Sequence, residues 1–245
     1  MKKLFFLVSF FCIVLVAGAQ DSYIMYETMY ITPKASKIKE FKAALSAHNK
    51  EFHASGASAV FIQWVSVGAR AGQYVWVMGP TTFTDLDSRP ADQGHEDDWG
   101  EVMQYVDEIS DIEYWKQDTD LSYTPEGWEN TSKIHIRAWD IKPGHMKEFN
   151  EILKQIAESC VKSDYKYSWH LYRSQFNTGN GRQVASVSGF ENWARFDEEG
   201  TWVKDFNELH REGAWAEAME LNRKIVVQMT QEVREIQPDL FQSSE

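Results

Sequence analysis

The sequence predicts an α+β protein built from two tandem ferredoxin-like βαββαβ repeats, whose antiparallel sheets pack face to face as one intrachain α+β barrel. Three observations predict this fold. The pentapeptide WGEVM at 99–103 recurs as WAEAM at 215–219. Lys-Glu-Phe occurs at 39–41 and again at 147–149, each time shortly after a proline that follows a strand-like run. Each half also contains two β-rich runs joined by a glycine-bearing turn. Such internal repetition indicates a duplicated unit.

The elements of the first half follow from local patterns. A strand-like run, YIMYETMYI, precedes Pro33, and proline near the first turn of a helix is a start signal because that turn needs no amide donor there. The runs AVFIQWVSV and QYVWVMG flank the turn GARAG and predict a hairpin. The helix that contains Trp99 and the run ISDIEYW at 109–115 complete the unit.

The second half repeats this order with different residues. The strand-like KIHIRAWD precedes Pro143 and a helix, and YSWHLYR and RQVASVSGF predict a hairpin with a longer loop. The helix of Trp215 and the run IVVQMTQEV follow. A βαββαβ unit places both helices on one face of a four-stranded sheet. Two such units can therefore bury their bare sheet faces against each other.

The boundaries begin with a predicted secretory signal peptide at 1–20. Lys2 and Lys3 precede an apolar run at 4–16, and small residues at 17–19 place the cleavage near Ala19/Gln20. The apolar run has 13 residues, fewer than the roughly 20 needed to span a bilayer. We therefore expect an exported protein, periplasmic or extracellular, without stable membrane insertion. The repeats are assigned to 21–124 and 129–245, with a linker at 125–128.

Charge and cysteine content exclude some partners and bonds. The full sequence has a net charge of −12, and loss of the two signal-peptide lysines makes it −14. An acidic protein of this kind repels phosphate backbones, so nucleic acid is not an expected partner. The mature chain keeps one cysteine, Cys160, which excludes an internal disulfide. Its helical context predicts a small buried hydrophobe rather than a reactive thiol.

The element order resembles that of the dimeric α+β barrel superfamily, which includes NIPSNAP-like, stress-responsive barrel and antibiotic-biosynthesis-monooxygenase-like proteins. The resemblance covers nearly the whole mature chain, with the pseudo-dimer fused into one polypeptide, and it speaks to fold more than to activity. In haem-degrading relatives, a helix histidine ligates iron beside a tryptophan and a first-strand asparagine. His95 or His210 would stand in for that histidine, and Trp76 or Trp64 for the tryptophan, but neither first strand contains an asparagine.

Strand alternation predicts which side chains face the barrel interior. His135, Arg137 and Trp139 share one face of their strand, and we expect that face to point inward. When the two repeats are aligned on their prolines, Glu27 of the first repeat occupies the position equivalent to Arg137 of the second. The two charges either pair inside the barrel or lie at exposed strand ends. His170 would also point inward, where it could meet His135.

The third strands differ between the halves. Tyr74 and Trp76 in the first correspond to Val184 and Ser186 in the second. Large side chains from one half either fill the space left by small ones in the other, or form the aromatic wall of a cavity together with Trp64.

The histidines do not predict a metal site. His48 and His53 are five positions apart, which does not align them on one helix face. His95 and His210 are the remaining candidates, and the simpler interpretation is that both are partly exposed residues at helix starts. No metal or cofactor is predicted, with haem as the alternative.

The leading functional hypothesis is an exported barrel, without assigned catalysis, that binds a small, largely apolar or aromatic molecule between its sheets. One alternative is a monooxygenase-like or haem-handling enzyme that uses an interior or helix-start histidine. Another is a protein-interaction module, and further self-association is left open. The predicted ligand-binding residues are Glu27, Trp64, Tyr74, Trp76, His135, Arg137, Trp139, His170 and Ser186.

Overall fold

The structure, a computed structural model, describes residues 23–89, 92–128 and 131–242. The predicted signal peptide at 1–20 lies outside these residues. Within the described ranges, none of the helices combines the length and the apolar character that a membrane crossing requires.

Eight strands form one closed barrel in the order β1-β3-β2-β8-β5-β7-β6-β4. Every neighbouring pair is antiparallel. The strands are β1 (Met25–Pro33), β2 (Val60–Val67), β3 (Tyr74–Thr81), β4 (Val106–Tyr123), β5 (Lys133–Ile141), β6 (Trp169–Ser174), β7 (Val184–Phe190) and β8 (Val226–Ile236). The sheets of the two halves are therefore joined by hydrogen bonds at both edges, β2 to β8 and β4 to β6. Strand pairing at both edges, in addition to face-to-face packing, therefore closes the barrel.

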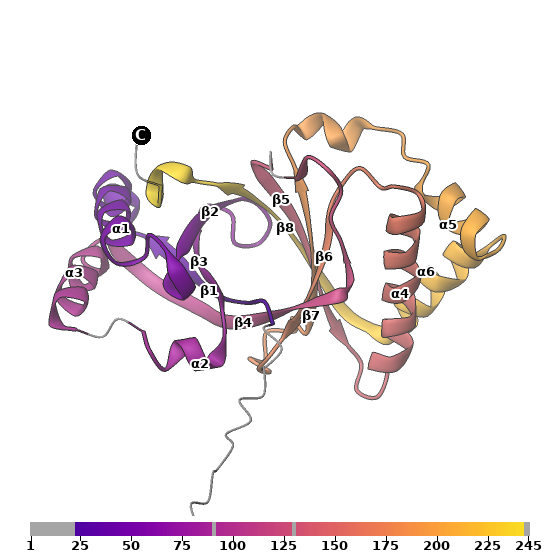
Figure 1. The fold of residues 1–245 in the computed structure, drawn as a ribbon, viewed down its shortest axis with the longest axis horizontal. Helices are drawn as coiled ribbons and strands as arrows, with labels where there is room; N and C mark the ends of the chain where they lie inside the picture. Colours follow the sequence, from indigo (N-terminus) through magenta and orange to yellow (C-terminus); the bar gives the residue numbers. More distant parts are fainter. Residues whose placement is uncertain (1–22, 90–91, 129–130, 243–245) are drawn as a thin grey trace, which may run out of the picture.

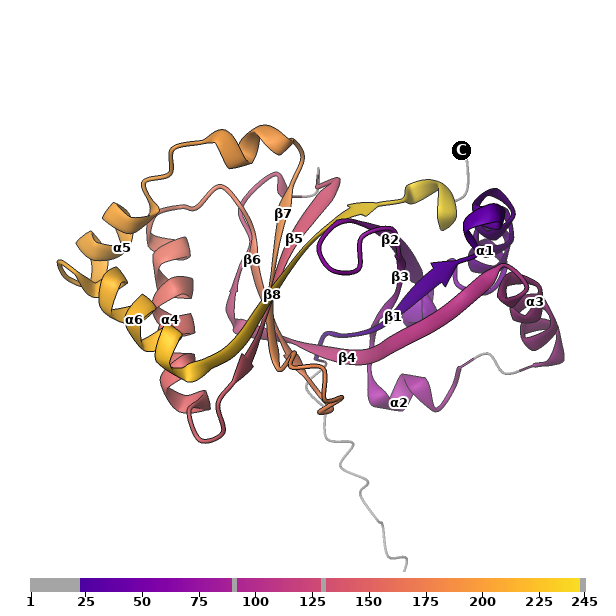
Figure 2. The same cartoon turned by 180° about the vertical axis from the view of Figure 1, so that it is seen from behind.

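The last strand of each half is longer than the sequence predicted, and this extra length closes the barrel. β4 pairs with β1 through its first part and with β6 from Trp115 to Tyr123. β8 pairs with β5 along most of its length and with β2 through its last residues, Val233 to Ile236. Figure 2 shows both strands running from one half of the molecule into the other.

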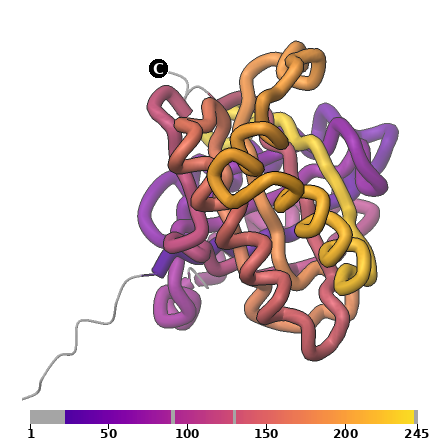
Figure 3. Tube along the Cα trace, turned by 90° about the vertical axis from the view of Figure 1, so that its right-hand side faces the viewer, coloured from indigo at the N-terminus to yellow at the C-terminus, as the bar shows by residue number. Residues whose placement is uncertain are grey.

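Helices cover the outer face of the barrel on two opposite sides (Figure 1). The first half carries α1 (Ile38–Phe52), α2 (Phe83–Leu86) and α3 (Gln93–Met103), and the second carries α4 (Met146–Lys162), α5 (Trp202–His210) and α6 (Ala214–Ile225). Seen from the end of the second half, its orange and yellow helices lie in front of the strands (Figure 3). The repeated motif residues Trp99 and Trp215 lie in α3 and α6, so they occupy comparable places in the element order. An ancestral duplication stays a prediction.

The strand faces that were expected to point into the barrel lie under the helices, and the opposite faces point into the barrel. Tyr74 packs against Phe41 of α1, and Trp139 packs against Phe149 of α4, so these aromatic faces lie under the helices. The barrel interior is instead filled by smaller side chains together with a few aromatic ones, including Val65, Val75, Val77, Ile136, Ala138 and Ala185. A closed eight-stranded barrel leaves room only for its own side chains, which favours the smaller set inside.

A buried polar network lies in the barrel where the halves meet. The Tyr30 hydroxyl of β1 donates to Glu232 Oε2 of β8 at 2.9 Å and accepts from Arg182 Nη1 at 2.8 Å and from Arg234 Nη2 at 2.6 Å. Arg234 Nη1 also donates to Gln63 Oε1 of β2 at 3.0 Å. These bonds connect strands of both halves inside a low-dielectric interior, where buried hydrogen bonds are strong and favour one strand register.

Gly68 is expected to be needed for closing the barrel. It follows β2 with φ of +122°, and a Cβ there would lie 2.8 Å from the backbone oxygen of Gln231 in β8. Gly68→Ala should lower the free energy of unfolding by about 1–3 kcal/mol, measured by urea denaturation, because it adds both backbone strain and a steric clash. Gly72→Ala is the matched control, since Gly72 has φ of +96° but no atom within 4 Å of its Cβ position. Equal losses in the two variants would contradict a role for the close approach to β8.

Candidate functional site

The barrel interior holds a cavity of only about 180 Å³. Its walls include Tyr26, Phe61, Trp115 and Tyr172, with Arg182 as one of its few charged groups. Small-molecule sites usually have volumes of roughly 300–1,000 Å³, so this space is better described as a packed core with a small void. None of the predicted ligand-binding residues lines it.

A larger pocket of about 400 Å³ lies between the sheet of the second half and the helices α4 and α6. We call it the second-half pocket. Aliphatic side chains of α4 form part of its wall. Its aromatic lining comes from β5, α4, the loop after α4, β6, α5 and α6: Trp139, Phe149, Tyr165, Trp169, Trp202 and Trp215. Concave sites lined by aromatic groups and a few polar ones are typical of ligand binding.

Two arginines supply the charge of the second-half pocket. Arg137 comes from β5, and Arg195 comes from the short 3-10 helix η4 (Trp193–Asp197) that follows β7. The described lining contains no carboxylate. Burial lowers the pKa of the Arg137 guanidinium, and the neighbouring charge of Arg195 lowers it further. Guanidinium groups remain protonated in proteins, so both positive charges persist in the pocket.

The two arginines differ in their partners. Arg195 Nη2 donates to Ser188 Oγ at 3.0 Å, and its guanidinium lies 3.9 Å from the ring centre of Tyr167. Arg137 makes no hydrogen bond or ion pair within the described residues. Its guanidinium is therefore half-buried without a carboxylate partner, and an anion in the pocket would compensate its charge.

Cys160 of α4 also lines the second-half pocket and is buried. Burial raises the pKa of its thiol to about 12, so the sulfur stays protonated and is a poor nucleophile. This agrees with the small buried hydrophobe that the sequence predicts.

The interior pairing of Glu27 with Arg137, one of the two alternatives, does not form. Glu27 is buried on the outer face of β1 and makes an ion pair with Arg89, which follows α2. Arg137 lies under the helices of the other half. Because both side chains point outward from the closed barrel, they face different helical layers and cannot meet.

The predicted inward histidines lie on opposite faces of the barrel wall. His135 is on the outer face, where its Nε2 is 2.9 Å from Gln231 Oε1, and burial lowers its pKa to about 4. His170 lies on the same strand face as the interior residue Tyr172, and its Nε2 is 2.8 Å from Thr124 Oγ1. No joint site of these two histidines is formed.

The four remaining predicted residues lie outside the barrel interior, as Glu27, Arg137 and His135 do. Trp64, Tyr74 and Trp76 belong to the apolar layer beneath the helices of the first half. Ser186 is buried on β7 opposite Arg137 of β5, on the outer face. Of the nine residues predicted, Arg137 and Trp139 line the second-half pocket. Ligand binding by any of them stays a prediction.

Sequence reasoning missed two constellations. Arg195 stands in an irregular segment, ENWARF, with no pattern that could place it beside Arg137. His48, His53 and His95 converge between α1 and α3, which the spacing argument had set aside.

The second-half pocket does not fit a haem ligated by histidine. No histidine is among its described lining residues. His210 instead lies with its Nε2 3.1 Å from the Gln155 backbone oxygen and 3.2 Å from Ser159 Oγ. His95 lies in the first half, in α3.

No protein family and no curated protein matches the chain in the comparisons. Solved structures do match it. An anthrone oxidase-like protein superposes with a TM-score of 0.57 at 10% identity, covering 89% of this chain and 92% of that one. The overall fold of this chain is therefore shared with that protein. A candidate monooxygenase from Lactobacillus acidophilus gives a TM-score of 0.53 at 10% identity, covering 87% and 94% of the two chains. Chlorite dismutase from Candidatus Nitrospira defluvii, in complex with imidazole, gives 0.53 at 9% identity, covering 88% and 92%.

Proposed function

We propose that this protein binds a small aromatic anion, a carboxylate or a phenolate, in the second-half pocket. The observation that carries the proposal is the pair Arg137 and Arg195, which face a pocket with aromatic walls and no carboxylate in its described lining. An aromatic ring would pack against the tryptophans, and its negative charge would compensate the arginines. Hydrogen bonds to charged groups contribute about 1.5–3 kcal/mol each, enough to select an anion over a neutral analogue.

The ligand proposed here is an anion rather than a largely apolar molecule, and it binds in the second-half pocket rather than between the two sheets. A largely apolar molecule between the two sheets would have to enter a void of about 180 Å³, whereas the second-half pocket offers about 400 Å³. The charge of the lining also favours an acid over a neutral hydrocarbon. We infer further that binding takes place outside the cytoplasm, as the sequence at 1–20 suggests.

Binding of 1-naphthoate and of its neutral amide, 1-naphthamide, tests the proposal. Both have the same rings, and quenching of tryptophan fluorescence or calorimetry reports their affinity. We expect 1-naphthoate to bind at least about tenfold more tightly than 1-naphthamide, as one charge-assisted hydrogen bond would give. Equal affinities, or no binding of either compound, would refute the anion site.

An oxygenase activity is the second candidate function. It is supported by the arginine pair, which would stabilise the anionic form of an electron-rich phenol, and by the structural likeness to the anthrone oxidase-like protein and the candidate monooxygenase. With an anthrone, whose anion carries a phenolate-like oxygen, dioxygen is the oxidant, the ring methylene becomes a carbonyl, and the second oxygen atom leaves as water. Oxygen uptake in the presence of anthrone, above the rate without protein, is the expected result. An unchanged rate would restrict the function to binding.

A further inference from the structure

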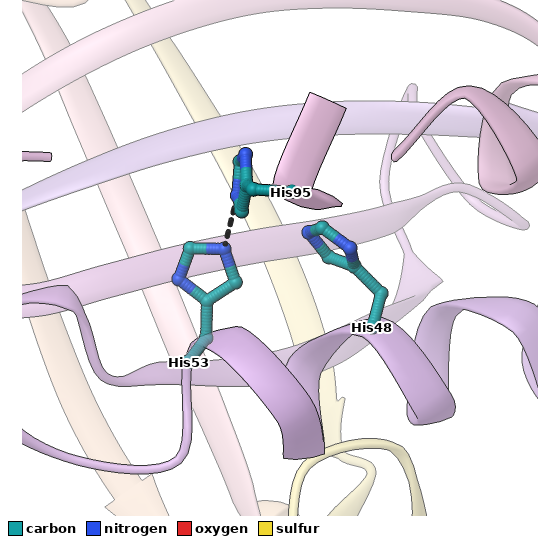
Figure 4. Close-up of side chains that lie close together, drawn as sticks. All are labelled: His48, His53 and His95. Atoms are coloured by element: carbon teal, nitrogen blue, oxygen red, sulfur yellow. Dashed lines mark hydrogen bonds between the residues drawn. The ribbon is translucent and has the colours of Figure 1, made fainter. Parts of the chain in front are cut away.

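Three histidines of the first half come together between α1 and α3 (Figure 4). His48 lies in α1, His53 directly follows it, and His95 lies in the first turn of α3. One ring nitrogen from each lies within 4.8 Å of the others, and the Nε2 atoms of His53 and His95 are 3.2 Å apart. His53 can join because the backbone leaves the helix there, with φ of −131° and ψ of 25°, so helical spacing does not govern its side chain.

The other ring nitrogens are held by fixed acceptors. His53 Nδ1 is 2.9 Å from the backbone oxygen of Ser58, which can only accept, so this nitrogen carries the proton. His48 Nδ1 is 2.8 Å from Asp98 Oδ1, and the carboxylate imposes the same tautomer. Each neutral ring is then left with a lone pair on Nε2. Carboxylates and backbone carbonyls orient metal-binding histidines in this way.

The surroundings suit a bound cation. The side chains of His48 and His53 are buried. The ring centroids of His53 and Trp76 are 5.3 Å apart, and those of His48 and Trp99 are 5.1 Å apart. The run Glu96-Asp97-Asp98 adds negative charge at the start of α3. Two imidazole nitrogens that face each other need a proton or a cation between them, and a third nitrogen is close by.

We propose that His48, His53 and His95 bind one divalent transition-metal ion of the zinc class, with Asp98 orienting His48. Zinc–nitrogen bonds of about 2.0–2.1 Å in a tetrahedral site place ligand atoms about 3.4 Å apart, close to the His53–His95 separation. Since the three ring nitrogens lie within 4.8 Å of one another, His48 needs to approach by at most about 1.4 Å. Imidazole ligands suit zinc, copper and nickel, and three protein ligands leave a fourth position for water or a substrate. This site is independent of the second-half pocket.

Calorimetric titration of the metal-free protein with Zn²⁺ tests the site. We expect one ion per chain, and we expect Co²⁺ to give the visible absorption of a tetrahedral complex. His95→Gln should weaken binding of both metals by more than about tenfold, because one ligand is lost. Asp98→Asn should weaken it by about 10–100-fold, because it removes an orienting acceptor. His145→Gln, which alters a histidine of the other half, should leave the affinity unchanged.

Folding of each variant is checked by its melting temperature in EDTA, and His95→Gln is the decisive variant because His95 is only half-buried. Zinc should raise the melting temperature of the unaltered protein and not that of His95→Gln. Absence of Zn²⁺, Co²⁺, Ni²⁺ and Cu²⁺ binding would overturn the proposal. Equal affinity of the unaltered protein and His95→Gln would also overturn it, since it would mean binding to surface carboxylates only.

Discussion

Glu232→Gln is expected to lower the free energy of unfolding by about 3–5 kcal/mol, the usual cost of breaking a buried ion pair. Glu232 is buried in β8 and receives hydrogen bonds from Tyr30, Arg70 and Arg234. The glutamine would leave the buried guanidinium of Arg234 without its counter-ion. Because the network lies where β8 of the second half meets strands of the first, the loss should appear as a lower urea midpoint of the whole molecule.

The pH dependence of stability gives a second readout of the same group. Burial alone would raise the pKa of Glu232, but the charges of Arg234 and Arg182 outweigh it and lower the pKa from 4.5 to about 2. A lowered folded-state pKa adds stability that is complete above the unfolded-state value and is lost as the pH falls toward the folded-state value. The unaltered protein should therefore lose about 3 kcal/mol between pH 4.5 and 2 that Glu232→Gln does not lose.

Glu235→Gln is the control for this prediction. Glu235 lies on the same strand, is half-buried and makes no ion pair within the described residues. It should change stability by less than about 1 kcal/mol. If Glu232→Gln is as mild as this control, the network does not hold the halves together.

Arg137→Gln is expected to weaken 1-naphthoate binding by about 10–100-fold, the equivalent of one charge-assisted hydrogen bond. The same change should stabilise the unliganded protein by about 1–2 kcal/mol, because a half-buried charge without a partner is removed from the vicinity of Arg195. A variant that gains folding stability and loses naphthoate affinity indicates that the arginine serves ligand binding rather than the fold. Calorimetry and urea denaturation on one preparation measure both.

Arg223→Gln tests whether overall charge explains such an effect. Arg223 is exposed on α6, and its replacement changes the net charge by the same amount. We expect unchanged naphthoate affinity and stability. A loss of stability in Arg137→Gln, with naphthoate affinity retained, would assign this arginine to structure instead.

Local patterns predicted the elements well. Alternation in the runs beginning at Tyr23 and Lys133, and prolines before the first helix of each half, located strands and helices that the structure contains. Alternation divides a strand into two faces but does not tell which one lies under helices. The large aromatic side chains of Trp76 and Trp139 were therefore placed inside, whereas they lie in the layers beneath the helices.

The candidate sites depended on geometry that spacing does not encode. His53 reaches His95 because the chain turns at the end of α1, a backbone change that no periodicity reveals. Arg195 reaches the second-half pocket from the short 3-10 helix η4, and pairing with Glu27 was one of the two alternatives for Arg137. Pairing of opposite charges is a sound expectation for two interior residues, but it fails when both point outward on different sides of the barrel.

A crystal structure of the protein soaked with 1-naphthoate would show where an aromatic anion binds. We expect the carboxylate to lie between the guanidinium groups of Arg137 and Arg195, with the rings against the tryptophans of the second-half pocket. Naphthoate seated in the barrel interior, or bound in the second-half pocket with its carboxylate turned away from both arginines, would contradict this expectation.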